Sequence, residues 1–265
     1  MTIHNTVTGE LKYFAPPTDG SKPWLDINVD FRKGEEGRNW VQEAHQVEIE
    51  NIRGNEDSVS LDTTGFTYYR RPQKYTSFKD DAEIEREYYP ESVELVKQLT
   101  GASRVVPFDH SMLSIASSML KLFSDSVNVL AIRRNRPNEI DDGPQKRQPV
   151  PYVHVDQTNE SAITRVHRHL PASEAPELLK HRFQIINLWR PIGHPAWDWP
   201  LALCDYRSVD TQNDLVPTIL RYPDHEGETL SVKYSANHKW KYLKGMEPDE
   251  FVLIKWCVVP GILLR

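Results

Sequence analysis

The second half of the chain is a series of short apolar runs separated by turn-forming residues, and this pattern restricts the fold more than any other feature. The runs lie at 183–191, 200–205, 216–222, 228–234, 239–243 and 251–257. Each has the length of one strand, and glycine, proline, aspartate and asparagine gather between them. Successive short strands of this kind predict a β-sandwich or a jelly roll.

The first half mixes strands with a helix. Residues 47–52 alternate apolar and polar side chains, which predicts a half-buried strand, and a turn at 62 leads into a second one. Residues 80–101 have the signals of a helix, with proline near its start and Gly101 at its end. Residues 103–110 are then expected to return to a strand.

Two more helices are expected between the strands. A short strand at 151–156 is followed by a helical pattern over 158–170, for which Thr158 is the expected N-cap, and by a shorter one over 173–181. The chain therefore reads as mainly β with flanking helices packed outside the sheets.

The 265 residues are expected to form a single domain. Residues 1–40 are polar and rich in glycine and proline, so we expect an extended N-terminal arm lying on that domain. Residues 111–131 differ in composition from their surroundings and contain many serines. They fit either an amphipathic helix packed on the core or an inserted segment. Residues 132–148 are strongly charged and are expected to be a loop.

Composition excludes several classes of function. A net charge of −6 gives no basic footprint for nucleic acid. Two cysteines, Cys204 and Cys257, are too few for a disulfide framework or a thiolate zinc site. The first residues lack the apolar core of a secretory signal, and no run is long enough to span a bilayer. We therefore expect a cytoplasmic protein without nucleic-acid or membrane partners, and we leave its oligomeric state open.

His154 and Asp156 form the clearest candidate for chemistry. They stand two residues apart on an expected strand, so both side chains point to the same face. An imidazole nitrogen and a carboxylate oxygen would then share one space, as two ligands of a facial metal triad do. The spacing is common, and the plainer interpretation of these residues alone is an exposed strand end.

The segments around this pair resemble the AsaB-type hydroxylase/desaturase family of fungal secondary metabolism, which is related to CmcJ and to gibberellin desaturase. The resembling segments are long, keep their order and cover most of the chain: VEIENIRG (47–54), EIEREYYPESVELVKQLTGA (83–102), PQKRQPVPYVHVDQT (144–158), RVHRHLP (165–171), RFQIINLWRPI (182–192), WPLALCDYRSVD (199–210) and HKWKYLKGMEPDEFVLIK (238–255).

The resemblance implies a double-stranded β-helix, which is a jelly roll, and an oxidoreductase that hydroxylates or desaturates a small organic molecule. It implies Fe(II) as metal and 2-oxoglutarate with O₂ as co-substrates, and a dioxygenase of secondary-metabolite biosynthesis. His154 and Asp156 match the first two iron ligands, and no catalytic side chain beyond the metal ligands is expected. Asn187 and Arg190 match a strand that also includes Trp189, and could bind a carboxylate. A structural ion pair and core packing explain them equally well.

The sequence departs from the family in two places. Members continue past the strand at 251–255 into a segment with the second iron histidine, whereas no histidine follows His238 here. The resemblance thus implies a C-terminally truncated jelly roll. His238, His167 and His169 are each expected at the surface or in packing rather than on the metal. Members also lack residues 111–131, so we expect an insertion there, and we hypothesise that both departures are unspliced introns.

Three interpretations follow. The first is an Fe(II)/2-oxoglutarate-dependent hydroxylase or desaturase. The second is a catalytically inactive relative or partner subunit without the distal histidine. The third sets the resemblance aside and expects a β-rich module that binds a small molecule.

Overall fold

In the computed structural model, which describes residues 5–26, 29, 37–107, 133, 149–150, 152–223 and 225–259, strands predominate. The strands are β1 (Thr6–Ala15), β2 (Trp24–Asp26), β3 (Val41–Asn51), β4 (Phe66–Arg70), β5 (His154–Val155), β6 (Phe183–Trp189), β7 (Ala202–Cys204), β8 (Leu215–Arg221), β9 (Glu226–Val232), β10 (Trp240–Tyr242) and β11 (Glu250–Val259). The α-helices are α1 (Asp81–Glu83), α2 (Tyr89–Thr100), α3 (Asn159–His169) and α4 (Ala175–Leu178).

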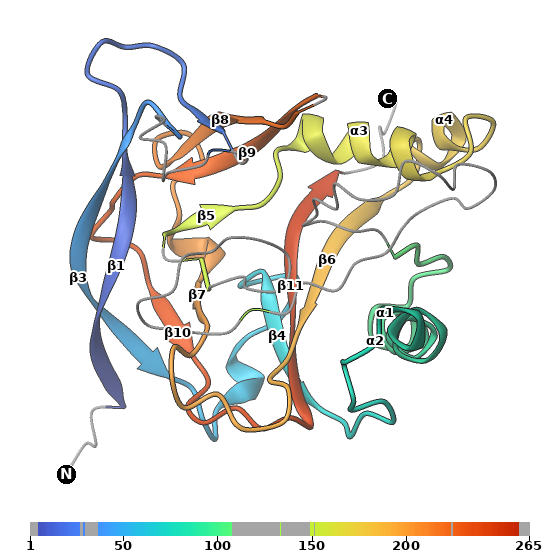
Figure 1. Cartoon of the computed structure of the whole chain (residues 1–265). Coiled ribbons are helices and arrows are strands. Elements are labelled where there is room, and N and C mark those ends of the chain that lie inside the picture. Colours follow the sequence, from blue (N-terminus) through green and yellow to red (C-terminus); the bar gives the residue numbers. More distant parts are fainter. Residues whose placement is uncertain are drawn as a thin grey trace.

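The strands form three sheets in the described part of the chain. Their orders are β1-β3-β10-β7, β4-β11-β6 and β2-β8-β9-β5. Neighbouring strands are antiparallel except for the pairs β3–β10 and β2–β8, which are parallel. Figure 1 shows the β1–β3 ribbon on the left, β4, β11 and β6 in the centre, α1 and α2 on the right and α3 and α4 along the top. The expectation of a mainly β protein with flanking helices is confirmed.

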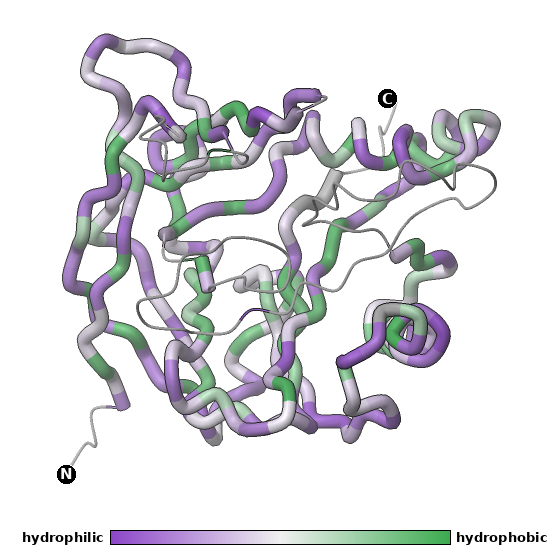
Figure 2. Tube along the Cα trace, in the orientation of Figure 1, coloured by the Kyte–Doolittle hydropathy of each residue, from purple (hydrophilic) through white to green (hydrophobic). Residues whose placement is uncertain are grey.

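The largest core cluster is built around β11. Phe251, Val252 and Leu253 are all 0% exposed, so this strand is covered on both faces where it passes between β4 and β6. Side chains from α2, β4 and β6 and from the loop after β10 complete the cluster. In Figure 2 the central strands have apolar stretches, whereas the outer β1–β3 ribbon alternates in hydropathy. Burial of apolar surface here, at roughly 25 cal/mol per Å², supplies the main favourable term in folding.

The described part of residues 1–40 contains strands β1 and β2, and β1 is an extended segment that lies along β3. All ten residues of β1 pair with β3, from Thr6 opposite Glu50 to Ala15 opposite Val41. Tyr13 is 0% exposed, and its hydroxyl accepts a hydrogen bond of 2.8 Å from Trp240 Nε1. The sequence did not predict β1 as a strand because most residues of its first half are polar and exposed. Its buried residues lie only near its C-terminal end.

The expected helices are present, with shorter bounds for one of them. A π-helical turn (Ile84–Tyr88) joins α1 to α2, and Gly101 ends α2 in the left-handed conformation with φ 69°. Thr158 is the N-cap of α3, where its hydroxyl accepts a hydrogen bond of 3.1 Å from Ser161 N. The helix expected over 173–181 is limited to α4.

One predicted strand is wrong, and the predictions for 111–131, for the loop over 132–148 (apart from residue 133) and for the chain beyond β11 lie outside the described residues. Residues 103–107 form no strand, because their backbone finds no neighbouring strand, and Arg104 instead forms an ion pair with Glu174. Residues 108–110 and the segment 111–131 are not among the described residues. The truncation expected beyond β11 also stays a prediction, since 260–265 are not described.

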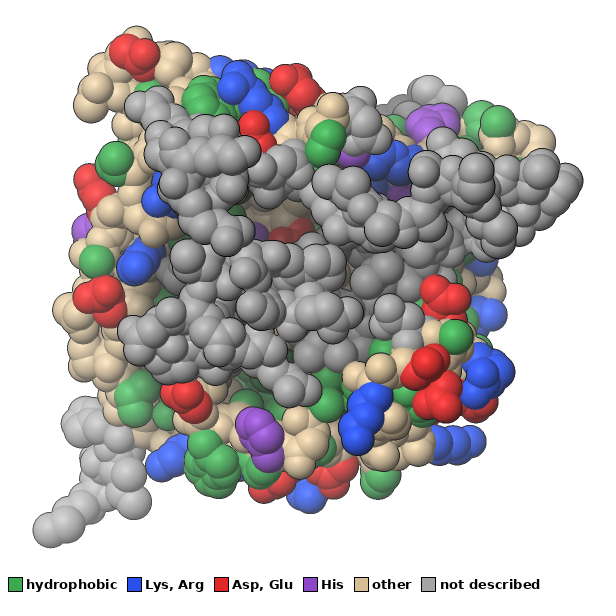
Figure 3. All heavy atoms as spheres, in the orientation of Figure 1, with side chains coloured by type: hydrophobic (Ala, Val, Ile, Leu, Met, Phe, Trp, Pro, Cys, Tyr) green, Lys and Arg blue, Asp and Glu red, His purple; other side chains and the backbone are tan. Residues whose placement is uncertain are grey.

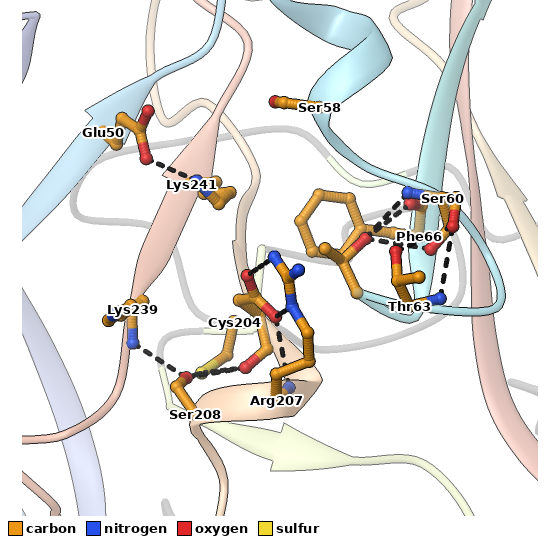
Figure 4. A network of polar contacts seen from close by, with 12 residues as sticks. Glu50, Ser58, Ser60, Thr63, Phe66, Cys204, Arg207, Ser208, Lys239 and Lys241 are labelled. Atoms are coloured by element: carbon orange, nitrogen blue, oxygen red, sulfur yellow. Dashed lines mark hydrogen bonds and ion pairs between the residues drawn. The ribbon is translucent and has the colours of Figure 1, made fainter.

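A network of polar contacts joins the edge strand β7 to β10 and β3. Ser208 Oγ donates to Asp205 O over 2.6 Å and accepts from Lys239 N over 2.9 Å (Figure 4). Lys241 forms an ion pair with Glu50 across the parallel β3–β10 pair. These contacts support the pairing of β7 and β10, which are only three residues long each.

The surface shows mixed charge on the face drawn in Figure 3, where Lys and Arg side chains alternate with Asp and Glu over the described residues. Among the helices that the structure describes, none has the length and apolar character needed to cross a bilayer.

Candidate metal site

The segment from His154 to Thr158 passes from a strand directly into a helix. His154 pairs with Ser231, and Val155 with Leu230, on β9. Thr229 Oγ1 donates a hydrogen bond of 2.6 Å to the Val155 carbonyl. The N-cap of α3 follows at once, and the Thr158 hydroxyl accepts from Ser161 N, so hydrogen bonds hold both ends of the segment.

The His154 and Asp156 side chains converge, as their spacing predicts. His154 Nε2 lies 3.1 Å from Asp156 Oδ1. The other ring nitrogen, Nδ1, lies 2.9 Å from the Tyr152 carbonyl, which can only accept, so Nδ1 is the donor. The side chains are 25% and 39% exposed, so the pair is reachable from outside.

Each member of the pair shifts the pKa of the other. Burial lowers the pKa of His154, but the hydrogen bond and charge of Asp156 raise it by more, so the net shift is upward. Burial raises the pKa of Asp156, whereas His154 and Asn187 lower it by more, so the net shift is downward. Asp156 is thus held as a carboxylate, the form that binds metal ions.

Asn187 reaches the same carboxylate from β6. Its Nδ2 donates a hydrogen bond of 3.1 Å to Asp156 Oδ2. The sequence gives Asn187 as a candidate, and the structure brings it to His154 and Asp156 across 31 positions of the chain.

Arg190 lies elsewhere. It follows the end of β6, donates to Gln73 Oε1 over 2.6 Å, and its guanidinium lies over the rings of Tyr88 and Phe251. These partners belong to the helix side of the sheet, and successive strand residues point to opposite faces. Trp189 packs against the large core cluster. The structure therefore does not bring Arg190 together with His154 and Asp156.

Aromatic side chains flank the histidine, and the sequence does not single them out. The ring centroids of His154 and Trp256 lie 6.4 Å apart at 19°, and those of His154 and Tyr152 lie 5.2 Å apart. The Trp256 indole N–H is buried without a hydrogen-bond partner. Trp256 stands in the segment where the sequence departs from the family, which is why resemblance could not identify it.

Gln157 is a further residue that the sequence reasoning missed. It is 8% exposed, and its Oε1 accepts hydrogen bonds of 2.7 Å from both Ser161 Oγ and Arg165 Nε. Ser161 and Arg165 lie four residues apart on one face of α3, and Gln157 stands four residues before Ser161, just ahead of the N-cap, so this spacing was the available signal. Their contacts fix the start of α3 beside the site.

A third ligand does not join the pair within the described part of the chain, where no cluster of three His, Cys, Asp or Glu residues could hold a metal ion. His238 is engaged by Asp214, with Nε2 and Oδ2 3.0 Å apart, and its side chain is 1% exposed. His167 and His169 lie in the last turn of α3.

Comparison with known sequences identifies relatives over most of the chain. The protein family described as "Oxidoreductase/YMDC permease-like domain" matches residues 11–258. The chain is 33% identical to the hydroxylase/desaturase CTB9 of Cercospora beticola, covering 96% of this chain and 85% of that protein. It is 30% identical to the Fe(II)/2-oxoglutarate-dependent dioxygenase nvfI of Aspergillus novofumigatus, covering 91% and 80% respectively.

Comparison with solved structures agrees. The iron and alpha-ketoglutarate-dependent endoperoxidase NvfI superposes with a TM-score of 0.75 and 25% identity over 96% of this chain and 85% of that one. A variant of the same enzyme gives a TM-score of 0.76. This likeness confirms the expected jelly roll. The chain belongs to the family of fungal hydroxylase/desaturases and Fe(II)/2-oxoglutarate-dependent dioxygenases.

Proposed function

We propose that this chain is an Fe(II)/2-oxoglutarate-dependent hydroxylase or desaturase of a small organic molecule, with His154 and Asp156 as iron ligands. Family membership supports the class of reaction. The observation that carries the site is the convergence of His154 Nε2 and Asp156 Oδ1.

The spacing of these two atoms fits neighbouring ligands on one metal ion. Two ligand atoms about 2.1 Å from a metal, at right angles, are about 3.0 Å apart. The observed separation of Nε2 and Oδ1 is 3.1 Å. A nitrogen and a carboxylate oxygen are also the donor types of the facial triad that binds non-haem Fe(II).

The chain's own groups prepare this pair for a metal. The Tyr152 carbonyl accepts from Nδ1, so a metal that displaces the Nε2 proton would meet the lone pair of His154 on Nε2, beside Asp156. The rings of Tyr152 and Trp256 lie beside the His154 ring, with centroids 5.2 Å and 6.4 Å from it. Bound iron, with 2-oxoglutarate and O₂, would supply the oxidising chemistry, while the protein supplies binding and orientation.

Asn187 remains in the proposed site and Arg190 does not. Asn187 contacts Asp156 directly, whereas the Arg190 guanidinium is held by Gln73 and two aromatic rings. An arginine that binds the co-substrate carboxylate is therefore not placed at Arg190. A cytoplasmic location and a small-molecule substrate remain expectations, the former from composition and the latter from family membership.

A metal titration tests the proposal. Wild-type protein, titrated with Fe(II) without oxygen, should bind one equivalent, and His154→Ala and Asp156→Ala should each abolish binding. His181→Ala is the matched control, since His181 is exposed. With O₂ and 2-oxoglutarate, the wild type should form succinate. Equal Fe(II) binding by wild type and His154→Ala would contradict the site.

The second candidate is a catalytically inactive relative or partner subunit. The specific observation in its favour is that no third ligand joins His154 and Asp156 among the described residues. A folded wild-type protein with no Fe(II) affinity would support this candidate.

A further inference from the structure

The side-chain amide of Asn187 contacts one oxygen of Asp156 and leaves the other to His154. We propose that Asn187 is a positioning residue, which holds the Asp156 carboxylate so that a single oxygen faces the metal together with His154 Nε2. This inference rests on the proposed function, since it assumes that Asp156 is a metal ligand.

The two carboxylate oxygens have different partners. Oδ2 accepts from Asn187 Nδ2 over 3.1 Å, and Oδ1 lies 3.1 Å from His154 Nε2. An ionised carboxylate only accepts hydrogen bonds, so Asn187 must present its NH₂ group. The terminal torsion of an aspartate is broad, and this hydrogen bond selects one orientation. Without it, Oδ2 would be free to rotate towards the metal as well.

Strand β6 holds the amide in place. Asn187 lies opposite Ile254 in the β6–β11 pair, and Ile185, two residues earlier, shares its face. Ile185 is 6% exposed and packs with Ala162 and Trp256. Because the strand is anchored by this cluster, the amide is presented to Asp156 from rigid backbone, which suits a residue that orients a ligand.

This role differs from direct binding of 2-oxoglutarate, which the family resemblance allows for Asn187. One N–H of the amide is already engaged by Asp156. Removing the amide should therefore weaken metal binding first, because residues that orient metal ligands typically contribute 10–100-fold to metal affinity.

The test uses Co(II) as the probe. Asn187→Leu keeps the approximate volume and removes the donor, and Gln184→Ala removes an amide from the opposite face of the same strand. We expect Asn187→Leu to raise the Kd for Co(II) by about 10–100-fold and to change the Co(II) visible spectrum, because Oδ2 can then also bind the metal. Gln184→Ala should match the wild type in both readouts.

A third readout separates the two roles. This readout is the Kd of 2-oxoglutarate for Co(II)-saturated protein, compared between the wild type and Asn187→Leu and set against the Co(II) affinity of each. The inference is overturned if Asn187→Leu leaves Co(II) affinity and spectrum unchanged. A raised Kd for 2-oxoglutarate with unchanged Co(II) affinity would show that Asn187 contacts the co-substrate instead.

Results that contradict the proposed function differ from results that contradict only the role of Asn187. A wild-type protein that binds no Co(II) overturns the metal site, and the role of Asn187 in metal binding with it. NMR of the metal-free protein then reports on the contact alone. The side-chain amide resonances of Asn187 should shift in Asp156→Ala, and their constancy would show that the hydrogen bond is absent.

Discussion

Trp256 should report on metal binding, because its ring is stacked against His154 with centroids 6.4 Å apart. A paramagnetic ion on His154 quenches an indole at this distance. We expect Co(II) to quench part of the fluorescence of the seven tryptophans, and Trp256→Phe to remove that part without abolishing Co(II) binding. Trp199→Phe, at an exposed tryptophan, is the control. Quenching that persists in Trp256→Phe would place the ion elsewhere.

Glu250 should stabilise the fold in a pH-dependent way. Burial raises the pKa of Glu250, but Arg53, which donates from Nη2 to Oε2 over 3.0 Å, lowers it by more, so the net pKa lies below 4.5. A carboxylate with a lowered folded-state pKa adds stability above its unfolded pKa, and this stability is lost as pH falls through the folded value.

Glu250→Gln should therefore lower the free energy of unfolding at pH 7 by about 1–3 kcal/mol, with the difference shrinking below pH ~4. Urea unfolding at several pH values measures it. Glu48→Gln, on the exposed side of β3, is the control and should stay within about 0.5 kcal/mol of the wild type. A difference that is constant down to pH ~3 would contradict the assigned linkage.

At the scale of elements, the N-cap of α3 matters because Thr158 stands only two residues after Asp156. Thr158 Oγ1 accepts from Ser161 N, and its side chain is buried. Thr158→Ala should cost about 1 kcal/mol in the free energy of unfolding, whereas Thr158→Ser keeps the acceptor and most of the stability. Equal losses in both variants would assign the effect to packing of the methyl group.

Strand β1 is tied to the sheet by the Tyr13 hydroxyl. Tyr13→Phe leaves the buried Trp240 N–H without its acceptor, which should cost about 1–3 kcal/mol. Tyr234→Phe is the control, because Tyr234 is 41% exposed. Urea unfolding compares the two. A neutral Tyr13→Phe would mean that this hydrogen bond adds little to the stability of the folded domain.

At the scale of the whole molecule, deleting residues 111–131 distinguishes the two interpretations of that segment. If it is an insertion, the shortened chain should keep its cooperative unfolding and its free energy within about 1 kcal/mol, because loop-closure entropy depends only weakly on loop length. A loss of more than about 3 kcal/mol would instead identify a helix that belongs to the core.

Local rules explain what could be predicted. Alternation, cap residues and glycine at a helix end are properties of neighbouring residues, so β3, α2 and α3 follow from the sequence alone. The strand at His154 followed by the cap at Thr158 is of this kind. The predicted strand at 103–107 was wrong because the apolar residues there fit a strand pattern but have no partner strand with which to pair.

The sequence by itself determined the class of fold and the pair His154 and Asp156, since their shared face depends only on the geometry of one strand. The tertiary structure decided which residues meet this pair. Asn187 reaches it through the β6–β11 register, Trp256 through packing on His154, and Arg190 is turned to the opposite face. Strand pairing and side-chain packing depend on the combined energies of many contacts between residues far apart in the sequence. A pattern of neighbouring residues carries no information about those contacts.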